Sequence, residues 1–156
     1  MRNLVIIRHA RASFDSPSGR DADRPLSASG HEEARAQGSW LASKALKPDR
    51  VLCSPAARTC ETADAMGLPI THRLDAIYEA SPGELVQLVE THGDADVVVL
   101  IGHNPGVSGL AAFLSGQQVV LSPGTIVEIA WESPVQAPLP LGSGHVKHFR
   151  HAGQDA

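Results

Sequence analysis

The chain of 156 residues is poor in aromatic side chains and has no excess of positive charge. Aromatic residues make up 4% of it, and 13 lysines and arginines stand against 17 aspartates and glutamates, for a formal net charge of -4. Nucleic-acid backbones and anionic membranes attract proteins with an excess of positive charge. We therefore expect neither a nucleic acid nor a membrane surface as a partner.

Long apolar runs are also missing. No run is longer than five residues, as in the strand-like runs at residues 4–7 and 97–101, whereas about 20 apolar residues are needed to span a bilayer. The N-terminus leads directly into the first run, without the longer apolar stretch and small-residue cleavage site of a secretory signal. We expect a cytoplasmic protein; the oligomeric state stays open, with a monomer slightly favoured.

Cysteine is scarce, since the chain has only Cys53 and Cys60. Two cysteines are too few for a disulfide framework, and their spacing matches no zinc-binding pair. Cysteine-dependent phosphatases place five residues between a strand-end cysteine and an arginine, but Cys53 and Arg58 enclose four. Both cysteines are therefore interpreted as reduced core residues.

Three histidines near the C-terminus recur at every third position, as His145, His148 and His151. Successive residues of a strand point to opposite faces, so the first two would point apart if this segment is a strand. Shared metal coordination is therefore not expected, and no metal or other cofactor is predicted.

Apolar segments of two kinds alternate along the chain. Short runs rich in β-branched residues fit buried strands; strand candidates are residues 4–7, 51–53, 69–72, 97–101, 125–131 and 145–149. Apolar residues at helical spacing predict helices over residues 29–45, 55–66, 84–90 and 104–114. This alternation predicts a three-layer α/β/α sandwich with a mainly parallel central sheet, as a single domain over residues 1–156.

Three predicted helix starts carry residues typical of caps. Ser29 with Glu32 fits a capping box. Ser54 and Asn104 each precede a proline, the pattern of a capping residue followed by proline at the first helical position. Pro48 is expected to close the first helix.

Two segments are expected outside the regular elements. Residues 10–26 carry Ser, Asp, Pro and Gly without periodicity, which predicts a long surface loop beside the first strand. The chain from His151 onward is expected to fray.

Basic residues stand at or just beyond the carboxyl ends of three predicted strands, as Arg8-His9, Arg58 and His103. In an open α/β sheet these ends line the ligand crevice, and helix N-termini can present free backbone N–H groups to it. Arginine offers a planar fork of donors suited to phosphoryl oxygens, while histidine changes protonation near pH 7. The set predicts phosphate chemistry.

These residues resemble the histidine phosphatase superfamily, which has an Arg-His pair after the first strand. The matching blocks are Ile6-Ile7-Arg8-His9-Ala10, Arg24-Pro25-Leu26-Ser27-Ala28-Ser29-Gly30, Cys53-Ser54-Pro55-Ala56-Ala57-Arg58-Thr59-Cys60-Glu61-Thr62-Ala63 and Gly102-His103-Asn104-Pro105-Gly106. The commonest form of the first block has glycine at the place of Ala10. The chain looks like the short SixA-type branch of phosphohistidine phosphatases, because it has Arg-Pro-Leu-Ser and lacks the long insertions of phosphoglycerate mutases and phytases. The resemblance implies a phosphoglycerate mutase-like fold.

The resemblance also implies a role for each matched residue. His9 would be the nucleophile and would form a phosphohistidine intermediate that water hydrolyses. Arg8, Arg58 and His103 would hold the phosphoryl oxygens and stabilise their charge in the transition state, and Asn104 would be a further phosphate ligand. This mechanism needs no metal.

Members of the superfamily usually add a carboxylate that protonates the leaving group. Glu79 lies in about the corresponding region and is the predicted donor, with Asp21 and Asp23 on the 10–26 loop as competitors. The residues around Glu79 do not match the mutase pattern closely. Imidazole leaves a protonated phosphohistidine as a neutral molecule and needs less help than an alkoxide, so a site without a strong acid suits an N–P bond.

Together these features predict a metal-independent phosphatase that acts on phosphohistidine carried by another protein, since a short chain has little sequence to build a lid. The same open crevice would admit small phosphomonoesters. A module that binds a phosphorylated ligand without turnover is a further alternative. A mutase-like activity is disfavoured by the missing insertions and the unclear acid.

Overall fold

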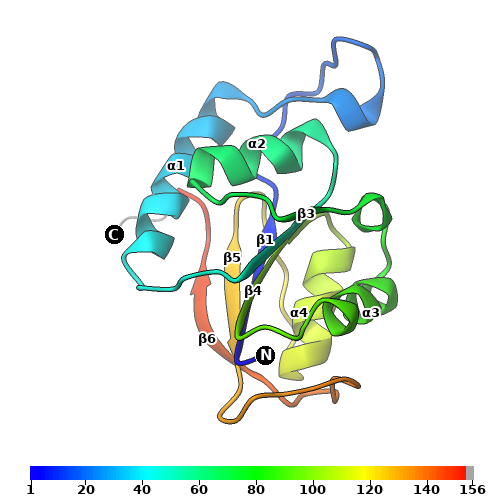
Figure 1. The fold of residues 1–156 in the computed structure, drawn as a ribbon. Helices are drawn as coiled ribbons and strands as arrows, with labels where there is room; N and C mark the ends of the chain where they lie inside the picture. Colours follow the sequence, from blue (N-terminus) through cyan, green and yellow to red (C-terminus); the bar gives the residue numbers. More distant parts are fainter. Residues whose placement is uncertain (154–156) are drawn as a thin grey trace.

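The computed structural model of the chain describes residues 1–153 and shows a six-stranded sheet between two pairs of helices (Figure 1). The strands are β1 (Asn3–Arg8), β2 (Arg50–Cys53), β3 (His72–Arg73), β4 (Val97–Gly102), β5 (Ile126–Ala130) and β6 (His145–Arg150). The helices are α1 (Ala28–Ala42), α2 (Ala57–Met66), α3 (Pro82–Thr91) and α4 (Gly106–Ser115), with short 3-10 turns η1 (Asp21–Asp23) and η2 (Asp75–Ile77). The predicted three-layer α/β/α arrangement is confirmed.

The strands lie in the order β3-β2-β4-β1-β5-β6. The first four run parallel to one another, whereas β5 is antiparallel to both β1 and β6. The sheet is therefore mainly parallel, as predicted, with antiparallel pairing added by its last two strands. The carboxyl ends of β1, β2 and β4 meet at one edge, which brings together the segments that follow them.

Two apolar cores flank the sheet, and β1 shows how its sequence serves both. Leu4 and Ile6 pack on the side covered by α3 and α4, while Val5 and Ile7 pack on the side covered by α1 and α2. Because successive side chains of a strand face opposite ways, a strand buried on both faces must be apolar throughout. This explains the continuous apolar run of β1.

The first helix differs from its prediction at both ends. It begins at Ala28, and the side chain of Ser27 caps it by accepting a hydrogen bond from the Gly30 amide. The predicted capping box of Ser29 with Glu32 is wrong, because the cap lies two residues earlier. The helix also ends at Ala42, before the predicted break at Pro48.

The two proline-marked starts are wrong as well. α2 begins at Ala57 and α4 at Gly106, so neither Ser54 nor Asn104 is the capping residue. The Ser54 hydroxyl has another partner, since it lies 2.8 Å from a ring nitrogen of His103. The Asn104 amide donates to the Leu121 carbonyl, although its oxygen still accepts from the Ser108 amide in the first turn of α4 at 3.3 Å. These contacts belong to the site described below.

The 10–26 segment is a surface loop, as predicted, and it is fixed to the start of α1. Ala12 forms an isolated antiparallel bridge with Leu26, and the Ser27 amide donates to the Arg11 carbonyl at 2.9 Å. A Cβ atom at Gly30 would lie 2.1 Å from the same Arg11 oxygen, so the loop can approach the helix only over glycine.

At the C-terminus, the expected fraying does not begin at His151, because its Nδ1 lies 3.0 Å from the Ser122 hydroxyl. The expectation also covers residues 154–156, which lie outside the described residues. Within residues 1–153, no helix is long and apolar enough to cross a membrane. Cys53 is a buried free thiol and Cys60 a partly buried one, which agrees with their interpretation as reduced residues.

Candidate active site

The backbone at the end of β1 is held by its neighbours on both sides. The His9 amide donates to the Gly102 carbonyl at 3.1 Å, and the Arg8 amide to the Thr125 carbonyl at 3.2 Å. The Gly124 amide in turn donates to the carbonyls of Arg8 and His9. Gly124 has a φ of +80°, a left-handed conformation that favours glycine. The Arg8-His9 pair is thus placed by the ends of the neighbouring strands.

The His9 ring is fixed in a defined tautomer. Its Nδ1 lies 2.7 Å from the Ala10 carbonyl oxygen, and a carbonyl can only accept, so Nδ1 carries the proton of the neutral ring and Nε2 keeps its lone pair. Burial lowers the pKa of His9 to about 4, opposed by the Ala10 bond and assisted by the charges of Arg58 and Arg8. A neutral ring with a free Nε2 is the form that can act as a nucleophile.

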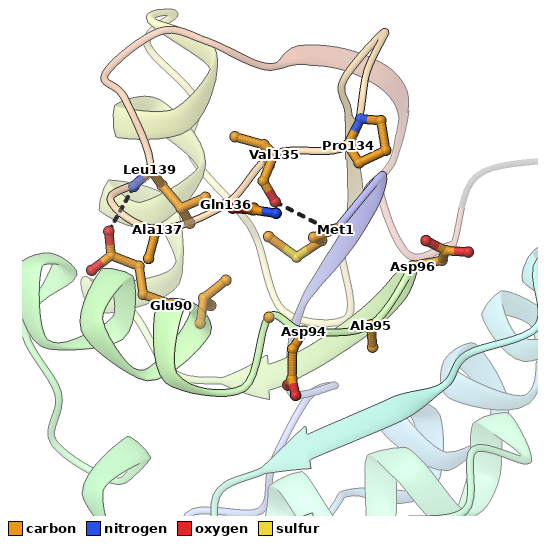
Figure 2. A pocket seen from close by; sticks show the side chains of 12 residues that line it. Met1, Glu90, Asp94, Ala95, Asp96, Pro134, Val135, Gln136, Ala137 and Leu139 are labelled. Carbon is orange, nitrogen blue, oxygen red and sulfur yellow. Dashed lines mark hydrogen bonds between the residues drawn. The ribbon is translucent and has the colours of Figure 1, made fainter.

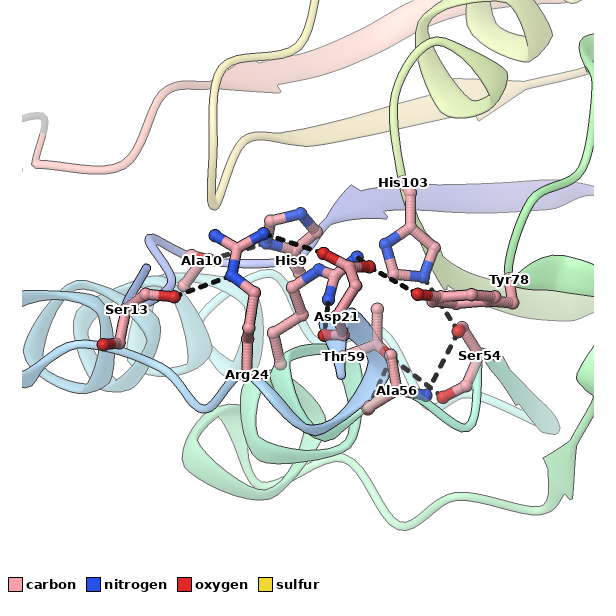
Figure 3. Close-up of polar contacts among 11 residues, drawn as sticks. His9, Ala10, Ser13, Asp21, Arg24, Ser54, Ala56, Thr59, Tyr78 and His103 are labelled. Atoms are coloured by element: carbon pink, nitrogen blue, oxygen red, sulfur yellow. Dashed lines mark hydrogen bonds and ion pairs between the residues drawn. The ribbon is translucent and has the colours of Figure 1, made fainter. Parts of the chain in front are cut away.

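His103 follows β4 and lies beside His9, with 5.4 Å between the ring centroids. Its Nε2 is 2.8 Å from the Ser54 hydroxyl oxygen, and the Tyr78 ring meets it edge-on at 5.5 Å (Figure 3). Its Nδ1 is buried and has no hydrogen-bond partner among residues 1–153. Burial, together with the charge of Arg58, lowers the pKa of His103 to about 3.

Arg58 is the second residue of α2 and is 7% exposed. Its guanidinium donates to the Asp21 backbone oxygen at 2.8 Å and to the Asp21 carboxylate at 2.9 Å. A cation in the first turn of a helix is disfavoured by the helix dipole, and Ala56 at the N-cap offers no side-chain acceptor. An anionic partner of Arg58 offsets both the unfavourable interaction with the helix dipole and the missing acceptor at the N-cap.

Arg8 completes the set of donors. Its Nη1 donates to the Leu121 carbonyl at 3.0 Å, while its Nε is buried and has no partner within the described part of the chain. Burial also lowers the pKa of Arg8. A buried polar group without a partner is costly, so Arg8 Nε and His103 Nδ1 are two places where an oxyanion would bring a missing partner.

Asp21 of η1 binds the same arginine that an anion would use. Its carboxylate accepts hydrogen bonds from the Tyr78 hydroxyl, from Arg24 at 3.0 Å and from Arg58. These bonds, that of Tyr78 first, hold the pKa of Asp21 far below its usual range. Asp23, the other loop competitor, instead bonds to Ser18 and Arg20 at 2.6 and 3.2 Å, so only Asp21 belongs to the site.

A cavity of about 400 Å³ opens beside Arg58 and His103, and Arg8 and His9 are not part of its lining. It is lined in part by Arg58, His103, Asp21, Tyr78, Glu79 and Asn104. Glu79 is exposed at its edge. The Asn104 amide donates to the Leu121 carbonyl and its oxygen accepts from the Ser108 hydroxyl, so the side chain is engaged within the protein. The proton-donor role of Glu79 and the phosphate-ligand role of Asn104 stay predictions.

The structure thus brings the four strand-end residues Arg8, His9, Arg58 and His103 to one edge of the sheet. Sequence reasoning did not find Tyr78, nor the contact between Ser54 and His103. The only signal for Tyr78 was its place next to Glu79. Ser54 had been assigned to helix capping, and no local pattern indicates that its hydroxyl faces a histidine 49 residues away.

A second cavity, of about 330 Å³, lies at the amino ends of β1 and β4 (Figure 2). Two of its polar groups are bonded to other residues of the lining: the Met1 ammonium donates to the Val135 carbonyl, and Glu90 accepts from the Leu139 amide. Its lining includes Asp94 and Asp96 but no arginine or histidine. These carboxylates would repel a phosphoryl group, so the phosphate chemistry belongs to the opposite edge of the sheet.

The three C-terminal histidines have separate surroundings. His148 bonds to Glu128 and His151 to Ser122, while His145 is exposed. Over residues 1–153, no three His, Cys, Asp or Glu side chains are grouped in a way that could hold a metal ion.

Comparison with known proteins gives consistent matches. The model of the histidine phosphatase superfamily (branch 1) matches residues 4–96. Phosphohistidine phosphatase SixA of Escherichia coli K12 is 34% identical over 120 residues, which cover 71% of this chain and 73% of that protein.

Solved structures agree over almost the whole chain. A protein of Nakamurella multipartitia, assigned as a phosphohistidine phosphatase SixA, superposes with a TM-score of 0.87 at 27% identity, covering 98% of this chain and 97% of the other. The protein histidine phosphatase SixA complexed with tungstate gives 0.78 at 26% identity, covering 96% of each chain. The predicted phosphoglycerate mutase-like sandwich is confirmed by these matches.

Proposed function

Because the chain belongs to the histidine phosphatase superfamily, we propose that it is a phosphatase that removes phosphoryl groups from histidine side chains of other proteins through a covalent intermediate on His9. The observation that carries the proposal is the His9 ring itself, neutral and bonded at Nδ1 to Ala10, with no hydrogen-bond partner for its Nε2 among residues 1–153. The SixA relatives support the substrate class.

In the first step, the Nε2 lone pair of His9 forms a bond to phosphorus while the bond between phosphorus and the substrate imidazole breaks. The imidazole leaves with the electron pair of that bond. Arg8, Arg58 and His103 donate to the three phosphoryl oxygens, where negative charge spreads in the transition state. Two N–H groups of Arg58 donate to Asp21 in the free protein, so the phosphoryl group and the loop carboxylate bind the same guanidinium.

In the second step, water attacks the phosphorus of phosphorylated His9. A P–O bond forms and the P–N bond to Nε2 breaks, so its electron pair returns to Nε2 and the ring, which keeps its Nδ1 proton, becomes neutral again. The protons of the attacking water leave with the phosphate. The products are inorganic phosphate and free enzyme. These two reaction steps use no metal ion, because the charge of the phosphoryl group is matched by the guanidinium groups of Arg8 and Arg58.

The leaving group decides how much acid catalysis the first step needs. A phosphohistidine ring that is protonated at its other nitrogen departs as neutral imidazole. Asp21 is ionised while Arg58 and Tyr78 bond to it, so it has no proton to give in this state. Glu79 at the cavity edge remains the predicted proton donor. A substrate with an N–P bond needs such a donor less than a phosphate ester does.

A short chain without long insertions leaves an open approach to the cavity, which favours a side chain presented by another protein over an enclosed metabolite. The cavity volume of about 400 Å³ is within the range of small-ligand sites. A cytoplasmic location and a monomeric state stay predictions from the sequence.

The test compares phosphate release by the wild type, His9→Ala and His145→Ala from a histidine-phosphorylated carrier protein and from an aryl phosphate. We expect fast release from the carrier protein, abolished by His9→Ala and unchanged by His145→Ala, since His145 is an exposed histidine of β6 outside the site. The aryl ester should react much more slowly.

Other outcomes separate the parts of the proposal. Faster turnover of the aryl ester would keep the mechanism and move the substrate to small phosphomonoesters. Turnover that survives in His9→Ala would refute the covalent mechanism. No turnover of either substrate, with phosphate binding retained in His9→Ala, would favour a binding module.

A further inference from the structure

Ser54 is a buried polar residue that the reaction steps above do not use. It directly follows β2 and has no exposed surface. Its amide donates to the Ile101 carbonyl at 3.2 Å, and its own carbonyl accepts from the Thr59 hydroxyl at 2.8 Å. Because the backbone is held on both sides, the hydroxyl has a fixed position at the carboxyl edge of the sheet.

The hydrogen bonds of this hydroxyl define where its proton goes. Within residues 1–153, the Ser54 oxygen has two hydrogen-bond neighbours, the Ala56 amide at 3.3 Å and His103 Nε2 at 2.8 Å. An amide N–H can only donate. The one neighbour that can accept the Ser54 proton is therefore His103 Nε2, and leaving a buried hydroxyl proton without an acceptor is costly.

When Nε2 accepts, the single proton of the neutral His103 ring must sit on Nδ1. This is the buried nitrogen without a partner, and Figure 3 shows it on the side of the ring that faces His9 and Asp21. The neighbouring His9 carries its proton on Nδ1 as well, but there the proton points to the Ala10 carbonyl. The same tautomer thus makes His9 a nucleophile toward the site and His103 a hydrogen-bond donor.

We propose that Ser54 is a positioning residue that fixes His103 in the tautomer with the proton on Nδ1, so that a neutral ring donates to an oxygen of the bound phosphoryl group. The inference rests on the proposed function only for the identity of that acceptor. The edge-on contact of Tyr78 with the ring supports the same orientation, and a neutral donor agrees with the lowered pKa of His103.

The direct test is nitrogen NMR of the full chain labelled at the histidine ring nitrogens, near pH 7 and without substrate. The signals of His103 are assigned by their loss in His103→Gln. We expect the shift of a protonated nitrogen for Nδ1 and that of an unprotonated nitrogen for Nε2. A proton on Nε2 in the wild type would overturn the proposal, whatever the enzyme assays show.

Two variants of Ser54 test the cause. Ser54→Ala removes the donor to Nε2, so His103 should lose its single tautomer, and kcat should fall about tenfold with a smaller change in KM. Ser54→Thr keeps a hydroxyl and should restore both the Nδ1–H tautomer and most of the activity. A Ser54→Ala protein that keeps the proton on Nδ1, or that changes tautomer at unchanged kcat, would refute the role.

Thr59→Val is the matched control, because it removes one of the two bonds that hold the Ser54 backbone and leaves the Ser54 hydroxyl in place as the donor to His103. The His103 tautomer should not change. If Thr59→Val altered the tautomer as Ser54→Ala does, general loosening of the segment would explain the effect. Turnover that survives in His9→Ala would refute the proposed function and leave the tautomer result unaffected, so the two failures are distinguishable.

Discussion

The two sides of the site are built differently. On the sheet side, Arg8 ends a strand and His9 and His103 follow strands whose backbones are paired with their neighbours, and Arg58 is 7% exposed. On the loop side, the Asp21 side chain is 52% exposed and its carboxylate is held by bonds from other side chains.

The two sides of the site therefore have different tasks. The sheet fixes the groups that must meet a phosphoryl group in one geometry, since preorganised donors stabilise a transition state without rearranging. The loop supplies a carboxylate that competes for Arg58 and that can be displaced, because its bonds are exposed to water. We therefore expect substitutions on the sheet side to affect turnover more than those on the loop side.

The largest contrast should come from two arginines. Arg58→Ala should lower kcat/KM for phosphate release by about 100-fold or more, since it removes a preorganised donor. Arg24→Ala should cost only about threefold, because Arg24 acts on the site through its bond to Asp21. Thermal unfolding of both variants checks that the fold persists, and equal losses for the two would contradict the division between sheet and loop.

The next effect concerns how the protonation of His9 and His103 depends on pH. Burial lowers the pKa of His9 to about 4 and that of His103 to about 3, so both rings should stay neutral from pH 7 down to about pH 5. An NMR titration of the labelled rings checks this directly, and a midpoint near the ordinary value of about 6.5 would refute it.

The same shifts predict a stability effect with a definite sign. As the pH falls from about 6.5 toward 4, the two rings take up protons in the unfolded chain but not in the folded one. The free energy of unfolding should therefore decrease over this window. Replacing His9 with the uncharged Gln should make the decrease shallower in urea unfolding measured at several pH values.

The smallest effect should come from the loop carboxylate. Asp21→Asn removes the negative charge on Arg58, so inorganic phosphate should bind about threefold to fivefold tighter in calorimetry. Asp23→Asn makes the same change of charge two residues away, where the carboxylate bonds to Ser18 and Arg20, and should leave the affinity unchanged. Weaker phosphate binding in Asp21→Asn would mean that Asp21 orients Arg58 instead of competing for it.

Much of the sheet side could be predicted from local patterns. β-branched runs mark buried strands, and parallel strands bring their carboxyl ends to one edge, so residues that follow them are expected together. Arg8, His9, Arg58 and His103 met there for this reason. The helix starts were harder, because Ser54 uses its capping-type side chain for a contact with His103, and Asn104 divides its side chain between the Leu121 carbonyl and the first turn of α4.

The loop side could not be predicted in the same way. The hydrogen bond between Tyr78 and Asp21 joins residues 57 positions apart. They lie in two connecting segments that show no apolar periodicity. Polar side chains in such segments can form hydrogen bonds of similar energy with many different partners. Asp21 and Asp23 were therefore equal competitors in the sequence, and only the packing of the loop separated them.

The sequence by itself determined the layered sheet, the residues at its carboxyl edge and the kind of ligand that two arginines and two histidines suit. These properties follow from periodicity and residue chemistry, which are local. The tertiary structure alone decided which nitrogen of each histidine bears a proton and which carboxylate binds Arg58. Those depend on hydrogen-bond partners from separate segments, and a partner exists only once the chain has folded.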